Sequence, residues 1–181
     1  YNQEKYIRKC LDGILAQETD FPFEIIVHDD ASTDSTPAII AEYAQKYPQI
    51  VKPIYQRENQ YSKGLVYIYH LALEQAQGDY VAICEGDDYW IDSQKLRKQV
   101  DFLRGHKDYT MVHSRCKVLY DDDQTALTHL RKREYSGSIF RELVRTNFIY
   151  SPTTLFSRRL AQEAIASFLE ESISRNWMTA D

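Results

Sequence analysis

The 181-residue sequence lacks any hydrophobic run approaching the ~20 residues that a membrane-spanning helix needs, and it shows no signal peptide. It also lacks repeats, linkers and low-complexity segments, which predicts one domain over residues 1–181. Positive charge is not in excess: the formal net charge of −5 argues against nucleic acid as the main partner. With 43% hydrophobic and 27% charged residues, the composition is that of a soluble globular protein.

Cysteine is also scarce. Cys10, Cys84 and Cys116 are widely spaced and lie in apolar contexts, so we interpret them as buried thiols in a reducing compartment, which indicates the cytoplasm. A zinc site is disfavoured because its cysteine ligands usually come in closer pairs. Tyrosine, in contrast, is abundant at 14 residues, which suits either aromatic stacking surfaces or a tyrosine-rich core.

Helices and strands are predicted to alternate along the chain. Apolar residues recur at spacings of three and four in the helical segments, and short apolar runs mark the strands. The predicted helices are 3–17, 38–47, 65–77, 92–104, 138–145 and 160–171, and the predicted strands are 23–28, 51–55, 79–84 and 110–120. This alternation favours an α/β fold with a doubly wound, mostly parallel sheet flanked by helices. Because a helix at residue 3 normally follows a strand, we expect either that a strand precedes Tyr1 or that the sheet begins at Phe23.

Three carboxylates follow directly on the apolar run that ends at Cys84. Glu85, Asp87 and Asp88 are separated only by Gly86, and such crowded charges repel one another. A hard divalent cation with oxygen ligands relieves this repulsion, and ligands of open α/β sheets bind at the carboxyl ends of strands. We therefore predict a metal-binding loop with Asp87 and Asp88 as ligands. The alternative is a solvated acidic turn in which Asp88 helps to cap the next helix.

A second acidic pair, Asp29–Asp30, ends the predicted strand 23–28. Since the carboxyl ends of parallel strands open on one edge of a sheet, we expect both acidic pairs to face the same cleft. A carboxylate there can accept a hydrogen bond from a nucleobase N–H. Arg57 and Lys63, in the polar loop after the next strand, are either ordinary surface charges or cations that neutralise phosphate beside the metal. Together these features indicate a nucleoside diphosphate site.

Motifs along nearly the whole chain resemble those of family 2 inverting glycosyltransferases, in the same order and at the same spacing. They are Tyr1–Asn2, Leu15–Gln17, Glu24–Thr36, Gly78–Tyr80 and Glu85–Trp90. The resemblance implies the GT-A fold, a doubly wound α/β domain that binds a nucleotide-sugar. It divides the chain into a nucleotide-binding half (residues 1–105) and an acceptor-side half (residues 106–181), and it implies that the domain continues beyond both ends of this sequence.

The resemblance also implies roles for individual residues. Tyr1 would stack near the base and Asp30 would bind uracil. Asp87 and Asp88 would occupy the acidic motif that holds the ribose and a metal ion, Mg²⁺ or Mn²⁺, on the diphosphate. Glu85 stands where the family usually has Asp; it keeps the charge on a longer side chain, which leaves its share in metal binding open.

The acceptor side is less well marked. The segment Ser151–Arg158 resembles the family's stretch near the sugar and acceptor pocket, so Thr153 or Thr154 would line that pocket. The family's catalytic base is an acid late in the domain, and Asp181 occupies this place; the alternative is a terminal Asp in a frayed tail.

The implied reaction is metal-dependent transfer of a sugar from a UDP-sugar donor to a hydroxyl group of a sugar or glycolipid acceptor, with inversion, in polysaccharide or glycoconjugate biosynthesis. A glycolipid acceptor would bring the protein to the inner face of a membrane. Two alternatives are a Mg²⁺-dependent phosphoryl-transfer or phosphoacceptor domain and a nucleotide-binding fragment without turnover. The residues His28–Asp30 are compatible with phosphoryl transfer, whereas Glu85–Trp90 is not expected there.

Overall fold

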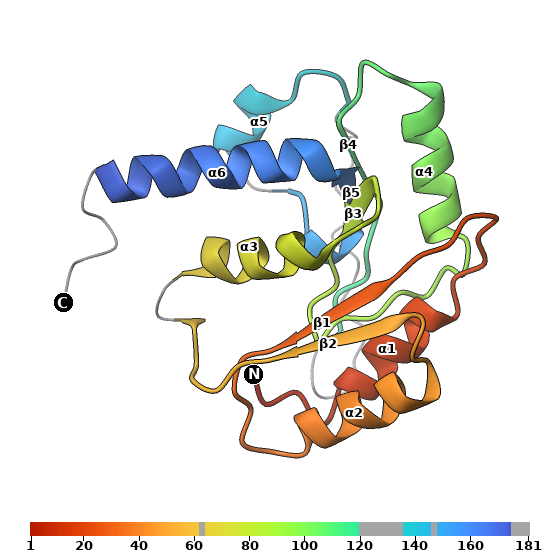
Figure 1. Cartoon of the computed structure of the whole chain (residues 1–181). Helices are drawn as coiled ribbons and strands as arrows, with labels where there is room; N and C mark the ends of the chain where they lie inside the picture. The colour runs from red at the N-terminus through yellow and green to blue at the C-terminus, as the bar shows by residue number, and fades with distance from the viewer. Residues whose placement is uncertain (62–63, 120–135, 146–147, 175–181) are drawn as a thin grey trace.

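The computed structural model describes residues 1–61, 64–119, 136–145 and 148–174 (Figure 1). Helices and strands alternate as the apolar pattern predicts, which confirms the α/β class. The helices are α1 (Ile7–Leu15), α2 (Thr36–Lys46), α3 (Leu65–Gln75), α4 (Lys95–Gly105), α5 (Phe140–Arg145) and α6 (Arg158–Ser174). The strands are β1 (Ile25–Asp29), β2 (Val51–Tyr55), β3 (Tyr80–Ala82), β4 (Met111–His113) and β5 (Thr154–Ser157). Within the described ranges, no helix combines the length and apolarity needed to cross a membrane.

The strands form two sheets. β1 and β2 pair in parallel, with α2 as the crossover between them. The second sheet has the order β3-β5-β4, and β5 is antiparallel to both neighbours. β3 and β4 therefore run parallel to each other, as a strand–helix–strand unit predicts. The expectation of a mostly parallel sheet is right for β1–β2 and wrong for the pairs that β5 makes, because this short strand returns between β3 and β4.

Two hydrophobic clusters hold the elements together. The first lies where α1 and α2 pack with β1 and β2 (Figure 1). Its buried residues are Ile7, Cys10, Leu11, Ile14, Ile25, Val27, Ile39, Ile40, Tyr43 and Val51. The second joins α4 to β5 through Leu96, Val100, Leu103 and Leu155. Phe23 and Trp90 pack against both clusters and thereby link them.

Helix α1 packs closely against the chain that leads into α4. A Cβ atom on Gly13 would stand 2.7 Å from the carbonyl oxygen of Trp90, so a side chain does not fit there. The Gln17 side chain then makes two hydrogen bonds with this segment: its Nε2 donates to the carbonyl of Asp92 at 2.8 Å, and its Oε1 accepts from the backbone N–H of Leu96 at 3.0 Å. Helix α1 thus holds the residues between β3 and α4 in place.

Candidate functional site

The acidic residues after β3 form a tight turn, which we call the acidic turn (residues 85–88). The backbone N–H of Asp88 donates to the carbonyl of Glu85 at 3.0 Å. The side chains of Glu85 and Asp87 are exposed, and Asp88 is half-buried. Burial, together with the charges of Asp87 and Glu85, raises the pKa of Asp88 to about 6. The carboxylates therefore crowd one another, and a proton or a cation would relieve them.

The acidic turn supplies only part of a metal site. Within the described ranges, no three His, Cys, Asp or Glu side chains gather closely enough to hold a metal ion. Asp87 and Asp88 are nevertheless adjacent hard oxygen donors, the ligand type that Mg²⁺ and Mn²⁺ prefer. Burial and the neighbouring charges of Asp87 and Glu85 raise the pKa of Asp88, and a bound cation would offset the repulsion between these charges. The residues present thus fit a divalent ion that takes its other ligands from water or substrate oxygens.

The second acidic pair closes a loop over the end of β1. Asp30 is buried, and its two carboxylate oxygens accept hydrogen bonds from the backbone N–H groups of Gln60 (2.7 Å) and Tyr61 (3.1 Å). A carboxylate has about four lone-pair sites, so these bonds leave acceptor capacity for a ligand. Beside it, Asp29 Oδ2 accepts from Ser32 N at 3.1 Å, while Asp29 Oδ1 is buried without a hydrogen-bond partner among the described residues. The free buried oxygen makes Asp29 a candidate for ligand contact beside Asp30, to which alone the resemblance gives a role in base binding.

The backbone turns sharply after this acidic pair. Ala31 has a φ of 60°, in the left-handed region that a non-glycine residue rarely adopts. Such a conformation costs about 1–2 kcal/mol and persists where surrounding contacts impose it. This strain lies directly next to the carboxylate predicted to meet the base.

The N-terminal residues lie between the two acidic loops. The backbone N–H of Asn2 donates to Ser32 Oγ at 2.8 Å, and that of Gln3 donates to Thr36 Oγ1 at 2.8 Å. On its other side, Gln3 is so near the acidic turn that a Cβ atom on Gly86 would lie 3.2 Å from Gln3 Cγ. Asn2 and Gln3 therefore connect the residues after β1 with the acidic turn.

The remaining predicted binding residues differ in how the structure places them. Tyr1 is 55% exposed and precedes the residue that bonds to the loop after β1, which leaves its ring free to stack on a ligand. Arg57 is exposed and forms no ion pair with the described part of the chain. Lys63 and the candidate base Asp181 lie outside the described residues.

The acceptor-side segment meets the acidic turn through a serine. Ser151 begins a 3-10 turn (Ser151–Thr153) that leads into β5, and its Oγ donates to Glu85 Oε1 at 3.0 Å. Thr153 and Thr154 are buried, and their hydroxyls donate to the carbonyls of Tyr150 and Ser151 within the same segment. The two threonines therefore shape the turn, and Ser151 supplies the contact that the sequence did not reveal.

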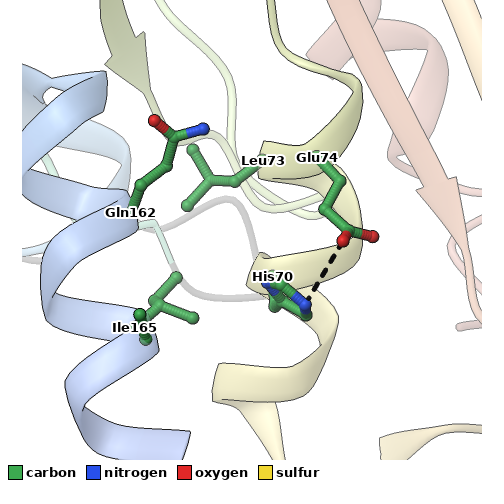
Figure 2. Close-up of a pocket in the computed structure, with 6 residues that line it drawn as sticks. His70, Leu73, Glu74, Gln162 and Ile165 are labelled. Carbon is green, nitrogen blue, oxygen red and sulfur yellow. Dashed lines mark ion pairs between the residues drawn. The ribbon is translucent and has the colours of Figure 1, made fainter.

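Two cavities lie elsewhere in the molecule. The first, of about 290 Å³, lies between α3 and α6, where His70 and Leu73 face Gln162 and Ile165 (Figure 2). His70 Nε2 lies 3.5 Å from a carboxylate oxygen of Glu74. The second, of about 390 Å³, lies at the other end of β3 from the acidic turn. None of the predicted site residues lines either cavity.

The structure is an α/β domain with carboxylates after two strands and an N-terminal segment with an exposed tyrosine, and the resemblance described above implies the GT-A fold for it. Comparison with known proteins agrees. The model of glycosyl transferase family 2 matches residues 1–165. The chain therefore belongs to glycosyl transferase family 2.

Individual relatives support this assignment. An uncharacterised protein of Mycobacterium tuberculosis is 43% identical over an alignment of 154 positions, and the alignment covers 82% of this chain and 44% of that protein. The crystal structure of residues 1–349 of Staphylococcus aureus TarS in complex with UDP is 28% identical, with a TM-score of 0.64, covering 91% of this chain and 46% of that one. A Pyrobaculum calidifontis mannosyltransferase in complex with GDP-Man and Mn²⁺ shares the fold at 24% identity, with a TM-score of 0.63 and coverage of 91% and 44%. The chain spans less than half of the length of each relative.

Proposed function

We propose that this protein transfers a sugar from a UDP-sugar to a hydroxyl group of a sugar or glycolipid acceptor, with inversion and with the help of a divalent cation. The observation that carries this proposal is the acidic turn, where Asp87 and Asp88 crowd each other at the carboxyl end of β3. A UDP complex of TarS and a GDP-Man and Mn²⁺ complex of the mannosyltransferase, both with this fold, support it.

The chemistry of the described residues supports this proposal for the base and the diphosphate of the donor. Asp30 is buried at the end of β1 and keeps free lone pairs for a uracil N–H, and the exposed ring of Tyr1 is available for stacking. Asp87 and Asp88 would hold Mg²⁺ or Mn²⁺, which when bound supplies charge stabilisation for the departing diphosphate. Arg57, exposed and without an ion pair among the described residues, would add positive charge beside the phosphates.

Inversion requires one base opposite the leaving group, which removes a proton from the acceptor hydroxyl as that oxygen attacks the anomeric carbon. We propose Asp181 for this role, with Lys63 as a second phosphate-facing cation. Both lie outside the described residues; Asp181 is assigned from the family resemblance, and Lys63 from its place in the polar loop after β2. An acceptor in polysaccharide or glycoconjugate biosynthesis, and a site of action at the inner face of a membrane when that acceptor is a glycolipid, are part of the same proposal.

The proposal is tested by nucleotide binding and donor turnover in the full-length protein. Thermal unfolding is followed with Mn²⁺ alone, with UDP or GDP alone, and with each pair, and hydrolysis of a panel of UDP-sugars is then measured. We expect UDP to stabilise the protein only in the presence of metal, and at least one UDP-sugar to be hydrolysed. Stabilisation by GDP in place of UDP would indicate that the donor is a GDP-sugar. If no nucleotide stabilised the protein, the proposal would be refuted.

Single substitutions, one of them a control, assign the effects to residues. Asp87→Asn and Asp88→Asn should abolish the metal-dependent stabilisation by UDP, because each removes a negative ligand. Asp108→Asn is the matched control, since Asp108 is an exposed carboxylate outside the site. Normal turnover in an Asp181→Asn variant would show that the base is another residue.

A further inference from the structure

Three side chains hold consecutive carbonyl groups of the segment Ser151–Thr154, which we call the anchored turn. Each side chain comes from α4 or from the residues just before it. The bonds run from Trp90 Nε1 to the carbonyl of Pro152 (2.8 Å), from Gln99 Nε2 to that of Thr153 (2.7 Å) and from Lys95 Nζ to that of Thr154 (3.5 Å). A backbone segment held at successive carbonyls in this way cannot shift without breaking several bonds together.

The three anchoring side chains are also bound to one another. Lys95 Nζ donates to Gln99 Oε1 at 2.9 Å and lies 4.1 Å from the centre of the Trp90 ring. Lys95 and Gln99 are 7% and 5% exposed, and among the described residues Lys95 has no carboxylate partner. Burying a lysine without a counter-ion is unfavourable, so its presence here needs a compensating role.

The other side of the anchored turn reaches the acidic turn. Ser151 Oγ donates to Glu85 Oε1 at 3.0 Å, and the carbonyl of Glu85 accepts from the N–H of Asp88 at 3.0 Å. Glu85 is one methylene longer than the Asp usual in the family, and in this chain its carboxylate binds Ser151. A continuous set of bonds thus leads from α4 through the anchored turn to the carboxylates after β3.

We propose that Trp90, Lys95 and Gln99 are positioning residues, which hold the anchored turn so that Ser151 fixes Glu85 and thereby keeps Asp87 and Asp88 in place for the metal and the donor. This inference rests on the proposed function, because it takes the metal ion and the nucleotide-sugar as the ligands of Asp87 and Asp88. Glu85 in this arrangement is a support for the acidic turn and not a metal ligand.

The first test is the metal requirement of UDP-sugar hydrolysis in the full-length protein. Gln99→Leu removes one anchor of the turn at nearly constant volume, and with it the acceptor for Lys95. Ser151→Ala removes the contact with Glu85. Because loss of one hydrogen bond to a site of this kind is worth about 1 kcal/mol, we expect each variant to raise the Mn²⁺ concentration at half-maximal rate about fivefold.

A double variant separates positioning from general damage. If Gln99 acts through Ser151, the variant that carries both substitutions should be no worse than the poorer single variant. Additive losses would overturn the proposal. Glu85→Asp should behave like Ser151→Ala, because the shorter carboxylate cannot reach the serine. An unchanged or lowered metal requirement in Glu85→Asp would instead indicate that Glu85 is a metal ligand, and this result would also overturn the proposal. Lys98→Met and Gln45→Leu are matched controls on exposed helix positions.

Hydrogen–deuterium exchange provides a readout that does not depend on turnover. In Gln99→Leu and Ser151→Ala, amides of residues 85–91 should exchange at least about fivefold faster than in the wild type, while those of α1 and β1 stay unchanged. Unchanged exchange in residues 85–91 would overturn the positioning role. A wild type that turns over no UDP-sugar but shows the expected exchange pattern would refute the proposed function and leave the positioning role standing.

Discussion

Replacement of Lys95 by methionine should remove a pH dependence from the stability of this protein. Lys95 is buried between Trp90 and Gln99, and burial lowers the pKa of its ammonium group from 10.5 to about 8. The unfolded chain keeps the ordinary value, so between pH 8 and 10.5 the unfolded chain binds more protons than the folded chain. The free energy of unfolding of the wild type therefore increases as the pH rises through this window.

The expected size follows from the two pKa values of Lys95. Crossing the whole window is equivalent to about 3 kcal/mol. A measurement that stops at pH ~9.5, before most tyrosines ionise, should recover about 2 kcal/mol of it. The neighbouring Cys84 thiol does not interfere, because its hydrogen bond with Cys10 and its burial raise its pKa.

The assay is urea unfolding of the wild type and Lys95→Met at two pH values, about 7 and 9.5, with the difference between the two proteins taken at each pH. Groups that both proteins share cancel in this difference. We expect the wild type to gain about 2 kcal/mol relative to Lys95→Met between the two pH values. Lys98→Met, which removes an exposed lysine paired with Asp92, should show little change. A wild-type–Lys95→Met difference that is independent of pH would refute the burial of this charge.

Three further predictions concern the site and its support. The pKa of Asp88 is raised to about 6, and below this value a proton on Asp88 competes with the metal ion. The Mn²⁺ concentration at half-maximal hydrolysis should therefore rise about tenfold for each pH unit below 6. An Mn²⁺ requirement that does not change with pH would count against Asp88 as a ligand. Gly13→Ala should lower the free energy of unfolding by about 1–3 kcal/mol, because the new Cβ would lie 2.7 Å from the carbonyl oxygen of Trp90. Gly105→Ala is the control: open space surrounds that position, so urea unfolding should show no loss of stability. Tyr43→Phe should lower the free energy of unfolding by about 1 kcal/mol, because the Tyr43 hydroxyl donates at 2.6 Å to a carboxylate on α1. Chiefly by burial, the pKa of this hydroxyl is raised to about 12, so the variant should lose the ultraviolet titration step near pH 12. An unchanged step would show that another tyrosine titrates there.

Local patterns in the sequence were enough to predict most of the elements. Helix α1 turns Ile7, Cys10, Leu11 and Ile14 inward, as their spacing of three and four predicts, and β2 has the bounds that its apolar run predicts. The strand β5 was missed, because its four residues mix hydroxyl and apolar side chains and a proline precedes them. Its place between β3 and β4 depends on pairing over long sequence distances, which no local pattern encodes.

The site shows the same division. The charge crowding of Asp87 and Asp88 could be predicted from adjacent letters, and the raised pKa of Asp88 agrees with it. The burial of Lys95 and Gln99 could not, because polar residues on a helix are ordinarily assigned to its exposed face. A usable signal was present: both positions lie next to the apolar stripe of α4, one turn apart. The pairing of Ser151 with Glu85 spans 66 residues and required the fold itself.

Trp90 packs against both hydrophobic clusters and is bonded to the carbonyl of Pro152. The acidic turn ends two residues before Trp90. This end of the turn therefore cannot open by local unfolding alone, because the free energy of opening includes part of the cost of separating the two clusters. Motions that admit a donor are therefore cheapest on the other side of the site, at the exposed residues 57–59 after β2, where few apolar contacts would have to be broken. The indole of Trp90 consequently reports on the packing between the two clusters, because it contacts both.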